Sequence, residues 1–185
     1  MSFPRVPLTR DEGVRRAVLA TGQRGYYRLG TGGRDPSKPV WKTFKDPKLG
    51  NIPAADCSAG ANNFCGEDRW DEAEDVWYDT SEILRDALRR KDNRRFKKVA
   101  VVDAVQPGDL LVYPDKDGRQ GHVAMVYKVL PGFKRGDLTP GKEWWRFVWV
   151  IDVSTRRGDR ACRIRTNAVL WAARGYFVRY LHWAS

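Results

Sequence analysis

Short apolar runs separated by turn residues fill the second half of the chain, and this pattern constrains the fold more than any other. Runs rich in valine and isoleucine, with turn signals between them, are typical of strands. Pro-Gly pairs follow Gln106 and Leu130, and an Asp-Lys-Asp-Gly turn covers 115–118. Because short connections join antiparallel neighbours, we expect an antiparallel sheet of five to six strands. The predicted strands are 99–105, 109–113, 122–130, 144–154, 161–166 and 176–183.

Helix signals occupy the first half of the chain. Thr9 and Glu12 have the spacing of a capping box, and the segment 11–20 continues with apolar residues at helical spacing as far as Gly22. A second capping box at 79–82 precedes another apolar stripe. Its predicted inner face comprises Ile83, Leu84, Ala87 and Leu88. N-terminal helices packed on an antiparallel sheet that follows them predict an α+β fold rather than an alternating βαβ fold.

A chain of 185 residues suits a single domain, so we expect one domain over 1–185 with its core at about 9–183. Residues 34–55 contain four prolines and no clear periodicity, which indicates an ordered loop packed on that domain. The longest apolar runs are interrupted within about ten residues, which is too short for a membrane-spanning helix. The N-terminal residues MSFPRVPLTRDEGVRR lack the apolar region of a secretory signal, so we expect synthesis in the cytoplasm without one.

The charge of the chain is strongly basic and unevenly distributed. There are 34 Lys and Arg against 23 Asp and Glu, a net charge of +11. Residues 119–185 alone hold 13 basic and four acidic residues, a net of +9. This balance favours an anionic partner such as nucleic acid, a membrane surface or a cell-wall polymer, although solubility alone also explains it. No RNA-binding or helix-turn-helix motif is present, which makes nucleic acid the less favoured partner.

Three cysteines and two histidines limit the metal chemistry open to the chain. Cys57, Cys65 and Cys162 form no C-x-x-C pair, and His122 and His182 do not have zinc-finger spacing. We therefore expect neither a metal site nor a cofactor. The cysteines do not indicate a disulfide framework either. One bridge between Cys65 and Cys162 would leave Cys57 free, and the sequence leaves that alternative open.

Cys57 precedes a segment of small residues, 58–61, that suits a helix start packed close to other backbone. At a helix N-terminus the helix dipole and the free N–H groups stabilise a thiolate, which makes Cys57 a candidate nucleophile. The alternative is a small core residue. Cys65 lies two turns further along the same segment and is expected to be a packing residue.

A nucleophilic cysteine needs a base, and the base needs a group that orients it. His182 lies in the last apolar strand and is expected to be structural, whereas His122 opens a strand after a glycine-rich polar turn. If the strands around His122 and Asp152 form a hairpin with its loop centred near residue 137, then His122 faces Asp152. An aspartate inside Phe-Val-Trp-Val-Ile-Asp-Val is costly to bury unless a partner pairs with it. The alternative is an aspartate that merely ends its strand.

These landmarks together resemble the NlpC-type cell-wall cysteine peptidases, the papain-like NlpC and p-sixty family. That family has an N-terminal helix, a tyrosine- and glycine-rich stretch, an Asp-Cys-Ser-Gly box, a Pro-Gly-Asp-Leu strand, a Gly-His-Val-Gly strand and a third polar residue, in this order. The chain follows this order over about 11–154. The matching stretches are Gly25-Tyr-Tyr-Arg-Leu-Gly30, Asp56-Cys57-Ser58-Ala59, Gln106-Pro-Gly-Asp-Leu-Leu111, Gly121-His-Val-Ala-Met-Val126 and Val150-Ile-Asp-Val-Ser154.

The chain departs from the family pattern in several places. Ala59 replaces the usual glycine, Asp152 replaces the common histidine, and the proline before the tyrosine is absent. The segments 33–56 and 131–142 are longer than usual. These departures bear on substrate details more than on the type of reaction.

The resemblance implies a papain-like cysteine peptidase or amidase in which Cys57 is the nucleophile, His122 the base and Asp152 the orienting residue. The expected substrate-binding residues are Tyr27, Asp56 and Ser58. The implied substrate is an amide bond of the peptidoglycan stem peptide, and the basic C-terminal third would hold the protein against an anionic wall polymer. We expect the acidic run 66–75 to be a solvated loop, with contact to a free amine of the substrate as the alternative.

Three hypotheses for function follow. The first is a cell-wall hydrolase that reaches the bacterial wall as a phage lysis or tail enzyme, or as an effector delivered by a secretion machine and restrained by an immunity or inhibitor protein. The second is an acyltransferase on the same fold, or a peptidase with a cytoplasmic substrate. The third is a basic binding module without catalysis, for nucleic acid or cell wall, which the net charge favours.

Overall fold

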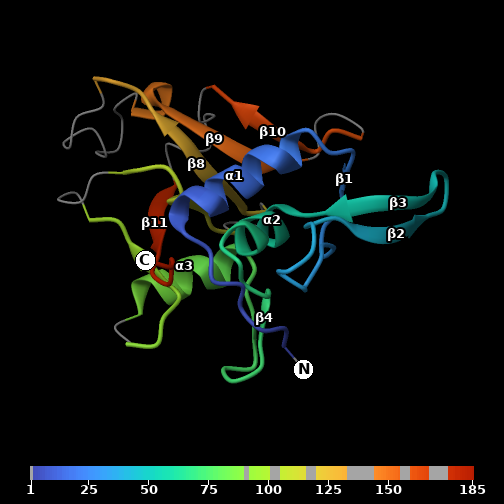
Figure 1. Ribbon diagram of the computed structural model, residues 1–185, viewed down its shortest axis with the longest axis horizontal. Coiled ribbons are helices and arrows are strands. Elements are labelled where there is room, and N and C mark those ends of the chain that lie inside the picture. The colour runs from blue at the N-terminus through green and yellow to red at the C-terminus, as the bar shows by residue number, and fades with distance from the viewer. Residues whose placement is uncertain are drawn as a thin grey trace.

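Three α-helices and a six-stranded antiparallel sheet make up the main body of the described part of the chain, beside a three-stranded and a two-stranded sheet (Figure 1). The computed structural model describes residues 2–89, 92–100, 105–115, 120–132, 144–154, 159–166 and 175–185. The helices are α1 (Arg10–Thr21), α2 (Cys57–Phe64) and α3 (Thr80–Leu88). The sheet has the order β10 (Cys162–Arg165), β9 (Val148–Val153), β8 (His122–Val129), β7 (Leu110–Tyr113), β11 (Tyr176–Tyr180) and β6 (Phe96–Lys98). The predicted α+β class is confirmed.

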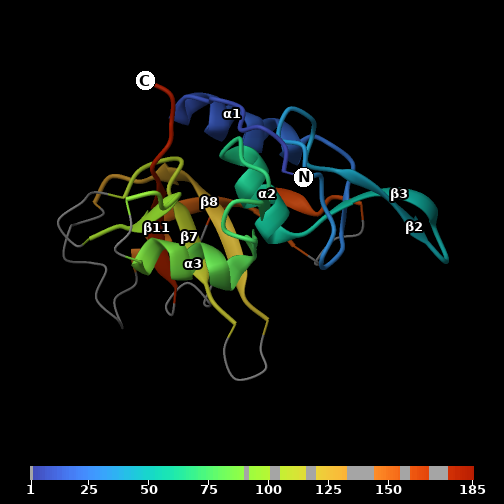
Figure 2. The same ribbon diagram turned by 90° about the horizontal axis from the view of Figure 1, so that it is seen from below.

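The sheet is buried on both faces, which explains why its central strands are continuous apolar runs in the sequence. Val123 and Met125 of β8 share one cluster with Ile151 of β9 and with the buried residues of all three helices. Ala124 and Val126 of β8 point to the other face and belong to a second cluster. The helices therefore cover one face of the sheet, as Figure 2 shows from a second direction.

The helix α2 is buried along its whole length, and small side chains make this possible. A Cβ atom on Gly60 would lie 2.9 Å from Val153 Cγ2 of β9. On the opposite side, Gly32 has a φ of +138°, and a Cβ atom there would lie 2.2 Å from Ala59 Cβ. Because only glycine allows this conformation and this approach, both neighbours can press against α2 and fix its N-terminus beside β8.

The predicted cap of α1 is confirmed in full. The Thr9 side chain accepts a hydrogen bond from Glu12 N, and the Glu12 carboxylate accepts one from Thr9 N. Gly22 caps the C-terminal end of the helix, as its position in the sequence predicts. No helix in the described ranges has the length and apolar character needed to cross a bilayer.

The cap of α3 is confirmed only in part. Asp79 accepts a hydrogen bond from Glu82 N, but the Glu82 carboxylate pairs with Arg85 and Arg89 instead of closing a capping box. The predicted inner face is correct except for Leu88, which is 55% exposed. Leu88 is the last residue of the helix, and Arg89 after it has an extended backbone conformation.

The prediction of an ordered loop over 34–55 is wrong. This segment contains β2 (Lys42–Asp46) and β3 (Gly50–Ala55), a hairpin that projects from the rest of the chain in Figures 1 and 2. The strand β1 (Tyr26–Tyr27) adds to it in parallel. Pro53 obscured the pattern, because proline argues against a central strand. It is tolerated since β1 pairs only with Ala54 and Ala55, so β3 has a single neighbour at Pro53.

Several strand boundaries also differ from the prediction. None of the described residues of the predicted strand 99–105 belongs to a strand, and the preceding strand β6 ends at Lys98. The first part of 144–154 is a 3₁₀-helix, Trp144–Phe147. The strands predicted at 161–166 and 176–183 are shorter, as β10 and β11. The segments 101–104, 116–119 and 133–143 lie outside the described residues, and they include parts of the predicted strand 99–105, turn 115–118 and long loop 131–142.

The hairpin of β8 and β9 forms as predicted, but its register differs by two residues. Asp152 pairs with Ala124, not with His122. The pairing of Val129 with Val148 puts the centre of the hairpin after residue 137, which accounts for the difference, and the irregularity between Val126 and Lys128 reduces it by one residue. His122 and Ala124 point to the same face of β8, so His122 lies diagonally opposite Asp152. The expected contact between these two side chains therefore survives the shift.

Candidate active site

Asp56 fixes the start of α2 and thereby the position of Cys57. Its Oδ1 accepts hydrogen bonds from Ala59 N at 2.9 Å and from Ser58 Oγ at 3.0 Å, which makes it the N-cap of the helix. Its Oδ2 accepts from Gly30 N at 2.8 Å. Cys57 is consequently the first residue of the helix, where the dipole favours a negative charge.

The buried arginine Arg69 completes this cluster. Its guanidinium donates to Asp56 Oδ2 at 3.1 Å and to Ser58 Oγ at 2.8 Å, and its side chain is only 4% exposed. Trp77 stacks on the guanidinium, with its ring centre 4.6 Å from Cζ. Asp56 and Ser58 line the cavity beside Cys57, but their polar atoms are engaged inside the protein. They hold the helix start in place more than they present groups to a substrate.

His122 is brought to Cys57 by the first residues of β8. The backbone N–H of Val123 and the imidazole of His122 both form hydrogen bonds to the thiol. The Nε2 atom of His122 lies 3.0 Å from Asp152 Oδ2, so Nδ1 is the ring nitrogen left to face Cys57. Since an ionised carboxylate only accepts, Nε2 carries the proton of that hydrogen bond.

Asp152 is fully buried in β9 and is surrounded by cations. Besides His122, Arg165 Nε donates to Oδ2 at 2.8 Å, and Arg163 Nε lies 3.7 Å from Oδ1. Burial works against the charged form of this carboxylate, but the hydrogen bonds from His122 and Arg165 outweigh it and lower its pKa. Asp152 therefore stays ionised and can stabilise a protonated His122. Three of the expected residues, Cys57, His122 and Asp152, thus form one connected chain of hydrogen bonds.

Electrostatics within this chain shift the two reactive groups in opposite directions. Burial alone raises the pKa of the Cys57 thiol, but the hydrogen bond and positive charge of His122 lower it overall. Burial likewise opposes the protonation of His122, but Asp152 and Cys57 raise its pKa to about 9. A lowered thiol pKa beside a raised imidazole pKa stabilises a thiolate–imidazolium pair at neutral pH, the form in which a cysteine is a nucleophile.

A cavity of about 250 Å³ opens over Cys57. Tyr27, Leu29, Trp77 and Thr80 are among its lining residues. Burial and the negative charges of Cys57 and Asp56 raise the pKa of Tyr27, so its phenol keeps its proton and hydrogen-bonds the thiol. Thr80 Oγ1 lies 3.9 Å from Cys57 Sγ. Leu29 and Trp77 are 65% and 38% exposed, so they give the cavity an apolar rim open to solvent.

The other cysteines are free, buried thiols outside this site. Burial raises the pKa of Cys65 well above its usual value, and burial with the nearby charge of Asp152 raises that of Cys162 to about 12. Both therefore remain protonated, and the packing role predicted for Cys65 agrees with its place in the core. His182 Nε2 lies 3.0 Å from the carbonyl oxygen of Arg94, as suits the structural role expected for it.

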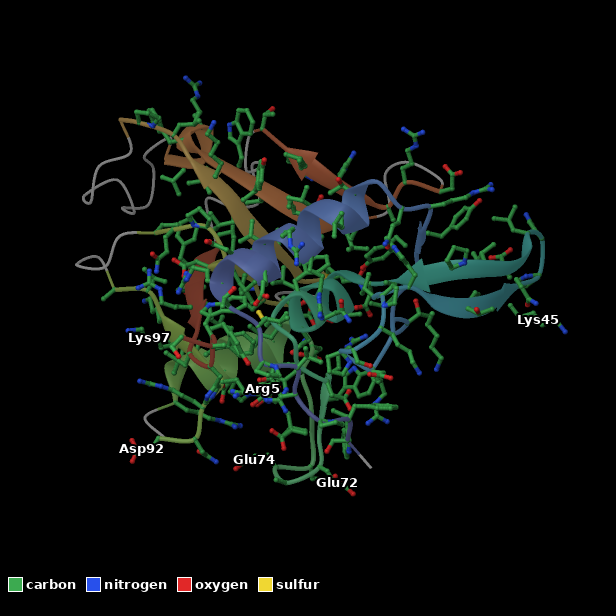
Figure 3. The ribbon with its side chains drawn as sticks, in the orientation of Figure 1. Arg5, Lys45, Glu72, Glu74, Asp92 and Lys97 are labelled. Atoms are coloured by element: carbon green, nitrogen blue, oxygen red, sulfur yellow. The ribbon has the colours of Figure 1, made fainter. Side chains whose placement is uncertain are left out.

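The prediction of a solvated loop over 66–75 is wrong for its first half. Glu67, Asp68 and Arg69 are 8%, 2% and 3% exposed. The second half forms the hairpin of β4 (Trp70–Asp71) and β5 (Val76–Trp77), and Glu72 and Glu74 point outward from its tip (Figure 3). The run is thus divided into a buried part beside α2 and an exposed tip.

The sequence interpretation missed three arginines of the site. Arg69 lies within the acidic run 66–75, whose composition indicates solvent exposure, so its burial was not predicted. The placement of Arg163 and Arg165 could have been predicted from the sequence. They lie two residues apart in the strand that follows Asp152 and therefore share one face of it. Within the described ranges, no group of three or more His, Cys, Asp or Glu is arranged to hold a metal ion.

Comparison of the chain with protein-family models, with curated proteins and with solved structures gives no match. A function must therefore be argued from the geometry of the site and from the order of the motifs in the sequence. Cys57 is buried at a helix N-terminus and faces a cavity. His122 contacts its thiol, and the buried carboxylate of Asp152 contacts His122.

Proposed function

We propose that the chain is a papain-like cysteine peptidase or amidase that hydrolyses an amide bond of the peptidoglycan stem peptide. The observation that carries the proposal is the hydrogen-bonded series Cys57, His122 and Asp152 beneath an open cavity. The type of reaction rests on this geometry. The choice of peptidoglycan rests on the resemblance of the motif order to the NlpC-type peptidases.

The first half of the reaction forms an acyl-enzyme. The Cys57 thiolate attacks the carbonyl carbon of the amide, and the negative charge moves to the carbonyl oxygen. Backbone N–H groups at the start of α2, including that of Cys57, stabilise this oxyanion. As the C–N bond breaks, the imidazolium of His122 gives its proton to the leaving nitrogen, and a free amine departs.

The second half releases the product. Neutral His122 takes a proton from a water molecule, which attacks the thioester carbonyl. The C–S bond then breaks, the acid product leaves, and the thiolate–imidazolium pair is restored. Asp152 keeps its negative charge throughout, orients the imidazole and stabilises it when it is protonated.

The proposal places the protein at the bacterial cell wall. Delivery by cell lysis, as part of a virion or through a secretion machine is compatible with it, and an immunity or inhibitor protein would accompany a delivered effector. Exposed lysines such as Lys45, at the far end of the β2–β3 hairpin in Figure 3, suit contact with an anionic wall polymer.

The decisive test is the release of fragments from purified peptidoglycan sacculi. We expect the protein to release them and Cys57→Ala to release none, while circular dichroism shows that the variant is folded. Cys65→Ala is the matched control, because it removes a buried thiol outside the site and should keep activity. Equal release by Cys57→Ala would exclude the nucleophile. No release by any variant, together with salt-sensitive binding of nucleic acid, would favour the basic binding module instead.

A further inference from the structure

Two cations share one oxygen of the buried carboxylate of Asp152. His122 Nε2 lies 3.0 Å from Oδ2, and Arg165 Nε donates to the same atom at 2.8 Å. The other oxygen, Oδ1, accepts no hydrogen bond from any residue in the described part of the chain. Both strong donors therefore contact Oδ2, the oxygen that orients His122, and neither contacts Oδ1.

Arg165 is itself anchored at a second point. Its Nη2 atom donates to Ser154 Oγ at 3.0 Å, and the same oxygen accepts from Arg163 Nη2 at 3.2 Å. The planar guanidinium of Arg165 thus bridges Asp152 of β9 and Ser154, which follows that strand, and only 15% of its side chain is exposed. A planar group held at two points fixes the direction of its N–H bonds better than a single contact does.

We infer that Arg165 is a positioning residue of the site. It holds Asp152 Oδ2 in place for its hydrogen bond with His122. Its positive charge also weakens the attraction between that oxygen and the imidazolium of His122. The inference rests on the proposed function only in so far as the pair of His122 and Asp152 serves catalysis. A buried carboxylate shared in this way stabilises the imidazolium less than one reserved for the histidine.

The charges around His122 come from three elements. Cys57 faces it from α2 and Asp152 from β9, while Arg165 and Arg163 reach Asp152 from β10. The negative charge of Asp56 acts on the thiol of Cys57. Removing the charge of Arg165 leaves the other groups unchanged, so the imidazolium of His122 should become more stable.

The test is a titration of the imidazole nitrogens by NMR in protein with ¹⁵N-labelled histidine. The chain has only two histidines, so His182→Gln assigns the signal of His122 without ambiguity. We expect Arg165→Met to raise the pKa of His122 by about one unit, the lower end of what one nearby charge produces. Arg165→Lys keeps the charge but cannot bridge both partners, and it should give a smaller rise.

Arg179→Met is the matched control. Arg179 lies in β11 of the same sheet, pairs with the buried Asp109 at 2.9 Å, and is 16% exposed, much like Arg165. Arg179→Met should lower the free energy of unfolding by an amount similar to Arg165→Met without changing the pKa of His122. No shift or a downward shift in Arg165→Met would overturn the inference, as would an equal shift in Arg179→Met. If Arg165→Met does not fold, Arg165→Gln replaces it with the same expected rise. The titration needs no substrate, so failure to cleave sacculi does not affect its result.

Discussion

At the scale of single residues, environment separates three cysteines of identical chemistry. Cys65 and Cys162 lie among apolar groups that disfavour a thiolate, whereas Cys57 has a cation, a backbone N–H and a phenol at its sulfur. The lowered pKa of the Cys57 thiol is therefore a property of its neighbours. His122 is the neighbour that matters most, because it is the one of them that carries a positive charge when protonated.

Two substitutions test the roles of the partners of Cys57. His122→Ala removes the proton carrier, so we expect kcat to fall by about 10³-fold with the fold retained. Asp152→Ala leaves the base in place but unoriented, so the loss should be smaller, on the order of 10²-fold. Measured rates of fragment release give both values. Undiminished turnover in His122→Ala would refute its role as the base.

The pH dependence of kcat/KM follows from the two opposite pKa shifts. The lowered pKa of Cys57 means that its thiolate is lost only as the pH falls below that value. The raised pKa of His122 means that its imidazolium persists until the pH rises through about 9. We expect a bell-shaped profile with its alkaline limb near pH 9. Asp152→Asn should move this limb to lower pH, and a profile that stays flat beyond pH 10 would contradict the ion pair.

At the scale of elements, the site depends on how the start of α2 is held. Asp56 caps the helix, Arg69 neutralises Asp56, and Gly32 lets the preceding loop touch the helix directly. Each contact comes from a different segment of the chain. The position of the thiol is thus set by the surroundings of α2 as much as by the helix itself.

Arg69→Met tests this support. It keeps most of the side-chain volume but leaves the buried carboxylate of Asp56 without its cation, so we expect unfolding to require about 3 kcal/mol less. Arg85→Met is the control, since Arg85 is 63% exposed where it pairs with Glu82, and its loss should cost under about 1 kcal/mol. Urea denaturation measures both. Equal effects would show that the pair of Arg69 and Asp56 is not a buried support.

Elements whose signals are local could be predicted from the sequence. The caps of α1 and α3 and the strands β7 and β8 depend on neighbouring residues, and they were found close to their true bounds. Elements stabilised by distant contacts were missed. The hairpin of β2 and β3 contains a proline that only its long-range pairing explains, and the burial of Arg69 depends on Asp56 and Trp77.

At the scale of the whole molecule, the C-terminal residues close over α1 and over the segment that leads into it. The N–H of Ala184 donates to the carbonyl oxygen of Leu8 at 2.7 Å. Trp183 packs against α1 so closely that a Cβ atom on Gly13 would lie 2.5 Å from its ring. The helix that covers one end of the sheet is therefore held by residues from the opposite terminus.

Trp183→Ala tests this closure. Because Trp183 is partly buried, we expect the free energy of unfolding to fall by about 2 kcal/mol, below the full cost of a core tryptophan. Leu181→Ala, at a residue that is 38% exposed, should cost less than about 1 kcal/mol. Thermal unfolding followed by circular dichroism compares them. A smaller loss for Trp183→Ala than for Leu181→Ala would contradict the closure.

The distribution of the site over the chain has a consequence for when the thiol becomes reactive. Cys57, His122 and Asp152 belong to α2, β8 and β9, which meet only through pairings between distant segments. In an unfolded chain Cys57 has an ordinary thiol pKa of about 8.5 and no proton carrier beside it. Under the proposed function, a chain on the ribosome, or one threaded unfolded through a channel, lacks the ion pair that activates the thiol. We propose that folding itself is the activation step of the enzyme.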